Sequence, residues 1–530
     1  MVAEAVVVGL IASVAGVGLG VLVAVGLQAL LGAFGIDLPG TGTRVLPRTV
    51  IVSLIVGQVV TVVSAVIPAR RASRIAPMAA LRAGPAEETG SLLRRTVVGA
   101  LVTAVGIGAL VSALVGDAGG IGVLGLGAAL VFVGVALMAP VAARPLARVV
   151  GAPLPRLAGV SGKLGRQNAI RNPRRTAATA AALTVGLGLV GCVSVLAASI
   201  KESSADIIDR ALAADFVVSS SQFMPTISTD LADRLAAVPE LGAVTSLQTG
   251  GWRFEGNGRS LFAGDPATIA SLMNLEVRSG DVDGLAEGGV MVEERQADEE
   301  GFRVGSSIPM EFARTGIQEL RVVGTYAQNQ LLGNYLVSTA TYVANYSERL
   351  DFVVLAKAAP GVPPATARTA LERVTADFPN VEVRDQTEFK ETQKDQVNQA
   401  LGLVSALLGL AIVIALLGIV NTLALSVFER TRELGLLRAV GMSRRQVRSM
   451  IRGESVIIAV IGAVLGLAVG VLFGWVLVAD LESQGISRLV IPFGQLLLYV
   501  VMAGVAGVLA AVFPARRAAN LDVLGAIAHE

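Results

Sequence analysis

Long apolar stretches almost free of charged residues constrain this sequence more than any other feature. A helix needs roughly 20 residues to cross about 30 Å of hydrocarbon. We therefore predict eight membrane-spanning helices, near residues 5–31, 49–67, 96–116, 119–143, 176–200, 397–428, 455–479 and 491–513. The composition agrees, because 16% of the 530 residues are charged, against about 25% in soluble domains. The chain is predicted to be an α-helical integral membrane protein.

The sixth stretch is longer than a bilayer requires. Residues 396–428 form an uncharged run of 33 residues, which is roughly 50 Å of helix. We expect this helix to project from the membrane as a stalk.

The basic residues lie almost entirely on one side of the predicted spans. Segments 69–95, 141–176, 428–453 and 514–530 contain 23 Lys and Arg residues, and the opposite short loops contain 3. Because basic loops stay in the cytoplasm, both termini of this plasma membrane protein are expected there. Segment 201–396 is then extracytoplasmic. It has 17 basic and 29 acidic residues, which suits a solvated acidic surface.

Several classes of chemistry are not expected. The single cysteine, Cys192, lies in an apolar run, and the single histidine, His529, is near the C-terminus, so a metal site built on these residue types is not predicted. No GxxxxGK[ST] sequence occurs, so no nucleotide-binding P-loop is expected. We predict no catalytic residue, no cofactor and no nucleic-acid partner.

An internal repeat relates the two ends of the chain. Glu4, Gly16 and Gly20 align with Glu454, Gly466 and Gly470, and the Pro-Ala-Arg-Arg sequence at 68–71 aligns with the same sequence at 514–517. The second copy is preceded by a span, the outer segment, the stalk and a basic linker, whereas the first copy begins at Met1. We interpret the chain as the later part of a duplicated protein, or as one whose missing half is supplied by another polypeptide.

The basic linker after the stalk has clear helix signals. Gly441 is suited to end a helix in a left-handed conformation, and Ser443 followed by Gln446 forms a capping box for the next helix. We predict a short helix over 429–440, with Leu434 and Leu437 on its apolar side and Arg430, Glu433 and Arg438 at its edges. Such a helix could contact a soluble partner or lie in the membrane interface among anionic lipids.

Glu4 and Glu454 occupy equivalent places in the two copies. A helix-end acid could pair with a linker arginine such as Arg448 or Arg452. We favour a simpler interpretation, in which each acid lies at the headgroup boundary near a helix N-terminus.

Segment 201–396 is predicted to be an α+β domain. Strands are expected at 215–220, 243–254, 320–325, 335–337, 352–356 and 381–383, and helices at 229–237 and 365–378. The pattern suggests a split α+β domain that contains an inserted β subdomain.

Two segments resemble the FtsX-like, MacB-type permeases of ABC systems in their duplicated arrangement. The segment from Ile419 to Ser455 includes Glu429-Arg430-Thr431-Arg432-Glu433 and Arg438-Ala439-Val440-Gly441, and it resembles the linker of that family. Residues 162–186 are similar to the amphipathic segment before the first span of the family.

This resemblance implies roles for both regions. The outer segment would be a MacB-type periplasmic core domain. The linker, through Glu429, Arg430, Glu433, Leu434, Leu437, Arg438, Gly441 and Ser443, would contact a cytoplasmic ABC ATPase dimer that binds the ATP.

The expected domains follow from these observations. They are two spans of a first FtsX-like unit (1–84), a two-helix insert (85–145), a lead-in with one span (146–200), the outer domain (201–396), and the stalk, linker and last spans (397–530).

The expected function is that of a permease without its own ATPase activity, which exports or extracts a lipid, lipoprotein, peptide or drug. The alternative is a non-transporting mechanotransmitter or receptor. Membrane lipid, and a second permease unit or the missing half, are the other partners expected.

Overall fold

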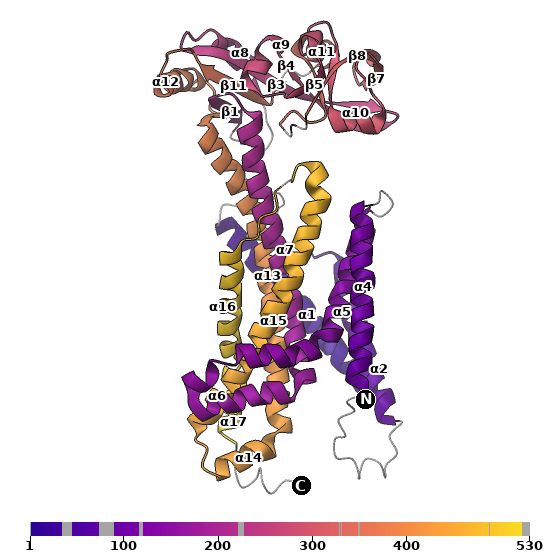
Figure 1. Ribbon diagram of the computed structural model, residues 1–530, viewed down its shortest axis with the longest axis vertical. Helices are drawn as coiled ribbons and strands as arrows, with labels where there is room; N and C mark the ends of the chain where they lie inside the picture. The colour runs from indigo at the N-terminus through magenta and orange to yellow at the C-terminus, as the bar shows by residue number, and fades with distance from the viewer. Residues whose placement is uncertain are drawn as a thin grey trace. The chain divides into compact units, whose positions relative to one another are not determined.

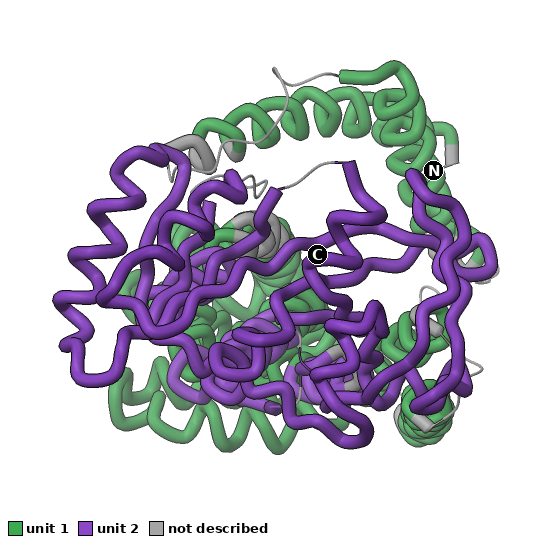
Figure 2. Tube along the Cα trace, turned by 90° about the horizontal axis from the view of Figure 1, so that it is seen from above, with its two compact units in different colours: residues 1–190, 399–470, 496–530 green, residues 191–398, 471–495 purple. Residues whose placement is uncertain are grey.

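The computed structural model describes most of the chain. It covers residues 2–33, 45–73, 90–115, 120–220, 227–327, 329, 331–347, 350–486 and 488–521. The chain divides into two compact units (Figure 2). The first contains residues 1–190, 399–470 and 496–530, and the second contains residues 191–398 and 471–495.

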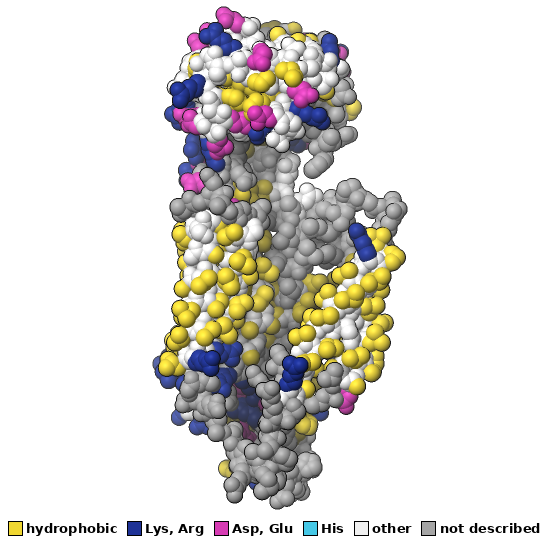
Figure 3. Space-filling view, turned by 90° about the vertical axis from the view of Figure 1, so that its right-hand side faces the viewer, with side chains coloured by type: hydrophobic (Ala, Val, Ile, Leu, Met, Phe, Trp, Pro, Cys, Tyr) yellow, Lys and Arg dark blue, Asp and Glu magenta, His cyan; other side chains and the backbone are white. Residues whose placement is uncertain are grey.

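The eight predicted spans are all helical (Figure 1). Within the described residues, each is long and apolar enough to cross a membrane. On the face shown in Figure 3, hydrophobic side chains cover these helices, and Lys and Arg side chains gather near one end of them. The helices are α1 (Val2–Ala33), α2 (Pro47–Ser73), α4 (Gly90–Val115), α5 (Gly120–Val150), α7 (Pro173–Ala211), α13 (Gln386–Glu429), α15 (Arg444–Asp480) and α16 (Phe493–Ala510), the last followed by α17 (Val512–Ala519).

Two of these helices are much longer than a bilayer needs. Helix α7 has 39 residues and α13 has 44, so α13 is roughly 66 Å long. The long helix predicted at this place is therefore present, and it begins ten residues before the uncharged run that predicted it. Both helices continue without a break into the segment that forms the outer domain.

Helices α7 and α15 pack through small residues. A Cβ atom added to Gly462 would lie 2.8 Å from the carbonyl oxygen of Ala180, and one added to Gly466 would lie 2.5 Å from that of Thr184. These distances are too short for any side chain, so glycine lets the two backbones come together. The regular spacing of these glycines in the sequence thus has a packing function.

Helix α6 (Leu154–Arg171) precedes α7, and small residues form its buried face. Its buried residues are Ser161, Gly162, Gly165 and Ala169, whereas Leu157 and Val160 are exposed. Gly165 lies directly on α15, because a Cβ atom there would be 2.7 Å from the carbonyl oxygen of Met450.

The outer domain is built on two β-α-β units. The first consists of β1 (Phe216–Ser220), α8 (Thr229–Ala236) and β3 (Leu241–Phe254), and the second of β11 (Val353–Ala358), α12 (Pro364–Thr375) and β12 (Val381–Asp385). These strands pair antiparallel in the order β12-β1-β11-β3. That is the ferredoxin-like arrangement, and it confirms the predicted α+β fold.

The inserted β subdomain extends the same sheet. Strand β3 is long enough to pair with β11 through its first half and with β4 (Asn257–Gly264) through its second half. The sheet continues in the order β4-β9-β6-β8-β5, and β7 pairs with β3 and β8. These strands are β5 (Val277–Gly280), β6 (Val290–Glu293), β7 (Ser307–Phe312), β8 (Gly316–Tyr326) and β9 (Tyr335–Ser338).

Each part of the outer domain has its own hydrophobic core. One core lies beneath α8 and α12 and includes Phe216, Leu231 and Leu371. Another lies in the inserted subdomain around Trp252 and Tyr335, whose rings meet edge to face with centroids 4.9 Å apart. The domain is therefore held by packing, as a chain with one cysteine requires.

Polar contacts attach both long helices to the outer domain. Gln386 at the start of α13 donates through Nε2 to the carbonyl oxygens of Leu212 and Ala214, at 3.2 and 2.8 Å. Lys390 of α13 pairs with Asp209 of α7. The start of α13 and the end of α7 are thus held together where the two helices meet the domain.

Asp351 provides a pH-sensitive test of the outer domain. Its carboxylate is fully buried, and it accepts a 2.7 Å hydrogen bond from Gln248 Nε2. Burial raises the pKa of Asp351, an effect that hydrogen bonds from Gln248 and Ser246 oppose. Because the folded-state pKa is raised, the stability that this carboxyl contributes at low pH is lost as the pH rises through that pKa.

We expect the stability of Asp351→Asn, relative to that of the unsubstituted protein, to increase as the pH rises from about 4 to about 8. Asparagine retains an acceptor for Gln248 and cannot ionise. The measurement is thermal unfolding followed by Trp252 fluorescence in a Trp475→Phe background. A difference in melting temperature that does not change with pH would contradict this explanation.

Candidate coupling site

The short linker helix forms as its sequence predicts. Helix α13 ends at Glu429, and α14 (Thr431–Ala439) follows after Arg430. The backbone N–H of Gly441 donates to the carbonyl oxygen of Arg438, and that of Met442 donates to Leu437. With Gly441 at φ 111°, these bonds form a Schellman motif that ends the helix.

The next helix starts with the predicted capping box. The backbone N–H of Ser443 donates to Gln446 Oε1 at 2.8 Å, and the N–H of Gln446 donates to Ser443 Oγ at 3.3 Å. Helix α15 then runs without interruption from Arg444 to Asp480. The chain therefore makes one sharp turn between α14 and the seventh span.

The apolar residues of α14 lie on two different faces. Leu434 is buried, and with Leu437 it lines a small pocket of about 50 Å³ between α13, α15 and α6. By contrast, Leu436 is 59% exposed and Val440 is 83% exposed. Leu434 and Leu437 therefore lie on one side of α14, and that side packs against the helix bundle. The apolar surface open to a partner contains Leu436 and Val440.

A buried acid lies behind α14. Glu454 Oε2 is 3.9 Å from Arg430 Nη1, and Asn168 Nδ2 of α6 donates to the same oxygen at 3.5 Å. Only 9% of the Glu454 side chain is exposed. A buried carboxylate is costly unless a cation and hydrogen bonds compensate for it, and Arg430 is the cation nearest in position.

This arrangement corrects two expectations about Glu454. The residue is not at a helix N-terminus, because α15 begins ten residues earlier at Arg444. Its partner is a linker arginine, as in the alternative interpretation, but the residue is Arg430 rather than Arg448 or Arg452. Arg448 Nε instead contacts the carbonyl oxygen of Arg444 at 3.4 Å.

Two further ion pairs, one of which involves Arg430, lie close to the Arg430–Glu454 pair and form a cluster with it. Arg430 Nε is 3.4 Å from Glu433 Oε2, and Arg175 Nη2 of α7 is 3.5 Å from Glu429 Oε2. Glu433 and Glu429 are largely exposed, whereas Arg175 and Arg430 are mostly buried. The cluster therefore connects α14 with α6, α7 and α15 at one place.

Arg438 faces away from the open surface of α14. It donates through Nη1 to the backbone carbonyl oxygen of Leu521, which follows α17. This contact links the linker helix to the end of the last span. Arg438 is thus half-buried and holds two segments of the chain together.

The remaining predicted residue, Glu4, lies in the first turn of α1 and is exposed. The two acids at equivalent repeat positions therefore differ in burial, since Glu4 is exposed and Glu454 is buried.

No group of three or more His, Cys, Asp or Glu side chains among the described residues could hold a metal ion. The cluster around Glu454 holds charged side chains in fixed positions, which suits mechanical coupling between helices.

Two protein families match this chain. The family described as "FtsX-like permease C-terminal" matches residues 405–523, and the one described as "MacB-like periplasmic core domain" matches residues 176–374. The first match includes the whole candidate coupling linker, and the second includes most of the outer domain.

Curated relatives and a solved structure are also similar. The macrolide export ATP-binding/permease protein MacB of Bordetella avium is 34% identical over 24% of this chain and 19% of its own length. An uncharacterized ABC transporter permease protein of Mycobacterium tuberculosis is 23% identical over 98% of this chain and 64% of its own length. The periplasmic region of MacB from Actinobacillus actinomycetemcomitans matches 34% of this chain and 94% of its own length, at 12% identity and a TM-score of 0.28. This chain thus spans less than two thirds of either curated relative.

We expect Arg430→Met to destabilise the protein by up to about 3 kcal/mol, because it leaves the Glu454 carboxylate buried without its cation. The double substitution Arg430→Met with Glu454→Gln should recover much of this loss, because it removes the charge. Thermal unfolding of the purified protein in detergent measures both effects. Arg432→Ala, on the exposed side of α14, is the control and should change little. Equal instability of the single and double variants would contradict the pairing.

Proposed function

Because this chain carries an FtsX-like permease C-terminal domain and a MacB-like periplasmic core domain, we propose that it is a permease subunit of an ABC-type complex. In this proposal a separate cytoplasmic ABC ATPase dimer binds and hydrolyses ATP. The permease couples that reaction to export or extraction of a lipid, lipoprotein, peptide or drug-like substrate. The relative from Bordetella avium is named an ATP-binding/permease protein, whereas the present sequence contains no P-loop motif.

The observation that carries this proposal is the surface of α14. Leu436 and Val440 are exposed on a helix whose opposite face is fixed to the bundle by Leu434 and by the Arg430–Glu454 pair. Exposed apolar side chains on a firmly held helix suit contact with another protein. A soluble ATPase that pushes on this surface would act on a helix whose covered side lies against α6, α13 and α15.

The continuity of the long helices supports transmission of such movement. Helix α14 follows α13 directly, and α13 is one helix from Gln386 to Glu429. Helix α7 is connected to the same cluster through Arg175, and it is one helix from Pro173 to Ala211. A displacement at the linker can therefore pass along two helices toward the outer domain.

We expect Leu436→Asp and Val440→Asp to reduce association with the co-expressed ABC ATPase several-fold, because a charge would replace apolar contact area. Co-purification from detergent-solubilised membranes measures this. Ile317→Asp is a matched control, since Ile317 is 66% exposed in the outer domain and should have no effect on binding. Retention of the ATPase by both α14 variants would contradict docking at this surface.

The proposed orientation leads to a separate prediction. In a Cys192→Ser background, a cysteine at Ser307 in the outer domain should react with a membrane-impermeant maleimide in intact cells. A cysteine at Arg445, beside the linker, should react only after the membrane is opened. Both positions are exposed. Labelling of both cysteines in intact cells would contradict the assignment of the outer domain and linker to opposite sides.

A further inference from the structure

The two copies of the internal repeat fold into equivalent helix pairs. In sequence, α1 aligns with α15 and α2 aligns with α16. In the first pair, a Cβ atom at Gly9 would lie 3.2 Å from Cβ of Thr61, and in the second pair, one at Gly507 would lie 2.8 Å from Cβ of Ala459. Gly9 aligns with Ala459 and Thr61 aligns with Gly507. The same contact is present in both copies. In the first copy the glycine is on the first helix of the pair, and in the second copy it is on the second helix.

In the second copy, a third helix lies against this pair. Gly462 and Gly466 of α15 contact the α7 backbone at Ala180 and Thr184, and a Cβ atom at Gly466 would also lie 3.1 Å from the N atom of Gly188. Small residues thus recur every four positions on both helices. This spacing allows close packing of two membrane helices.

In the first copy, the equivalent face is open. The residues that align with Gly462, Gly466 and Gly470 are Ala12, Gly16 and Gly20, and all three are exposed. A Cβ atom at Gly16 or Gly20 would meet nothing within 4 Å.

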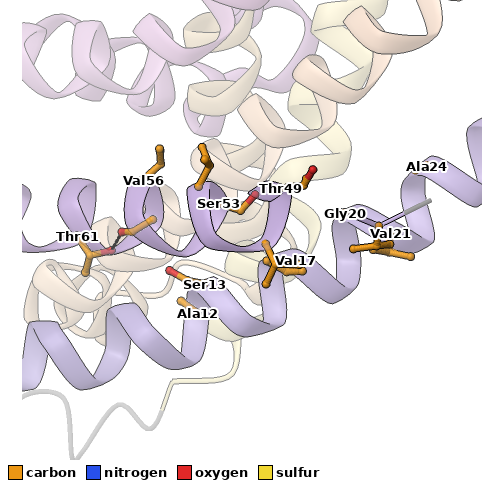
Figure 4. A pocket seen from close by; sticks show the side chains of 15 residues that line it. Ala12, Ser13, Val17, Gly20, Val21, Ala24, Thr49, Ser53, Val56 and Thr61 are labelled. Carbon is orange, nitrogen blue, oxygen red and sulfur yellow. Dashed lines mark hydrogen bonds between the residues drawn. The ribbon is translucent and has the colours of Figure 1, made fainter. Parts of the chain in front are cut away.

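These three residues line a groove of about 800 Å³ between α1 and α2. In Figure 4, Ser13 and Val17 extend from α1 toward α2, and Gly20 lies farther along α1. The face that holds α7 in one copy is therefore present and unfilled in the other.

We propose that the groove between α1 and α2 binds a membrane-spanning helix of the α7 type, from a segment other than residues 173–211 of this chain. Such a helix presents small residues at every fourth position, as Ala180, Thr184 and Gly188 do in α7. The α7 of this chain cannot fill the groove, because it is already packed against Gly462 and Gly466. A face that contacts only lipid would not need small residues at these positions. The proposal does not depend on the ATPase contact.

A synthetic peptide with the sequence of residues 173–200 tests the groove directly. The peptide carries Gly188→Cys and Cys192→Ser, and the full-length chain carries Cys192→Ser with Gly16→Cys. In lipid nanodiscs under mild oxidation, we expect a disulfide between peptide and chain, because the equivalent residues Gly188 and Gly466 pack together in the second copy.

Gly18→Cys is the matched control. Gly18 is also exposed and open, but its equivalent, Ala468, is exposed on α15 and does not belong to the helix-binding face. We expect several times less cross-linking at this position than at Gly16→Cys. Equal cross-linking of the two variants, or none with either, would overturn the proposal and indicate a lipid-facing groove.

Two further outcomes complete the test. Gly16→Leu should abolish binding of the peptide, because the added side chain prevents close approach of the peptide backbone at this position, whereas Gly18→Leu should leave binding intact. Efficient Gly16→Cys cross-linking between two copies of the chain, without peptide, would overturn the proposal by identifying the occupant as the chain itself. Comparison of each variant's elution from size-exclusion chromatography verifies that the protein is folded.

Discussion

The buried carboxylate of Glu454 is the interaction around which the helices near the linker are arranged. It contacts Arg430 at the junction of α13 and α14, and Asn168 of α6. A buried charge requires partners in fixed positions, so these segments are held in one arrangement. The linker helix α14 consequently presents Leu436 and Val440 outward, while Leu434 is covered. The polar contact inside the bundle thus lies on the same covered side of the linker as Leu434.

Close helix packing has the same importance within the membrane. Helices α7 and α15 approach through Gly462 and Gly466, where no side chain could fit. Because α7 then continues beyond its apolar stretch to Ala211, this contact holds one part of a much longer helix. The outer ends of α7 and α13 are held by Gln386 and by the pair between Lys390 and Asp209. Rigid helices with contacts at both ends are suited to transmit force over distance.

Local signals in the sequence predicted much of the coupling site. Gly441, and Ser443 with Gln446, predicted where α14 ends and α15 begins, because caps depend on residues close together in the chain. The strands of the outer domain followed from their alternating pattern. The partner of Glu454 did not, because Arg430 reaches it only through the turn between α13 and α15. The position of Glu454 inside α15 was also missed. Its charge made Ser455 the first residue of the predicted span, whereas the helix begins at Arg444.

The sequence by itself determined the membrane spans, the α+β outer domain and the relation between the two repeat copies. Each of these depends on hydropathy, periodicity or identity along the chain, which are properties of the sequence. Only the tertiary structure decided which face of each helix is covered. Ala12, Gly16 and Gly20 resemble Gly462, Gly466 and Gly470 in sequence, yet one set is open and the other is buried. A row of small residues permits close packing in both copies, but whether a helix lies against it depends on the arrangement of distant segments.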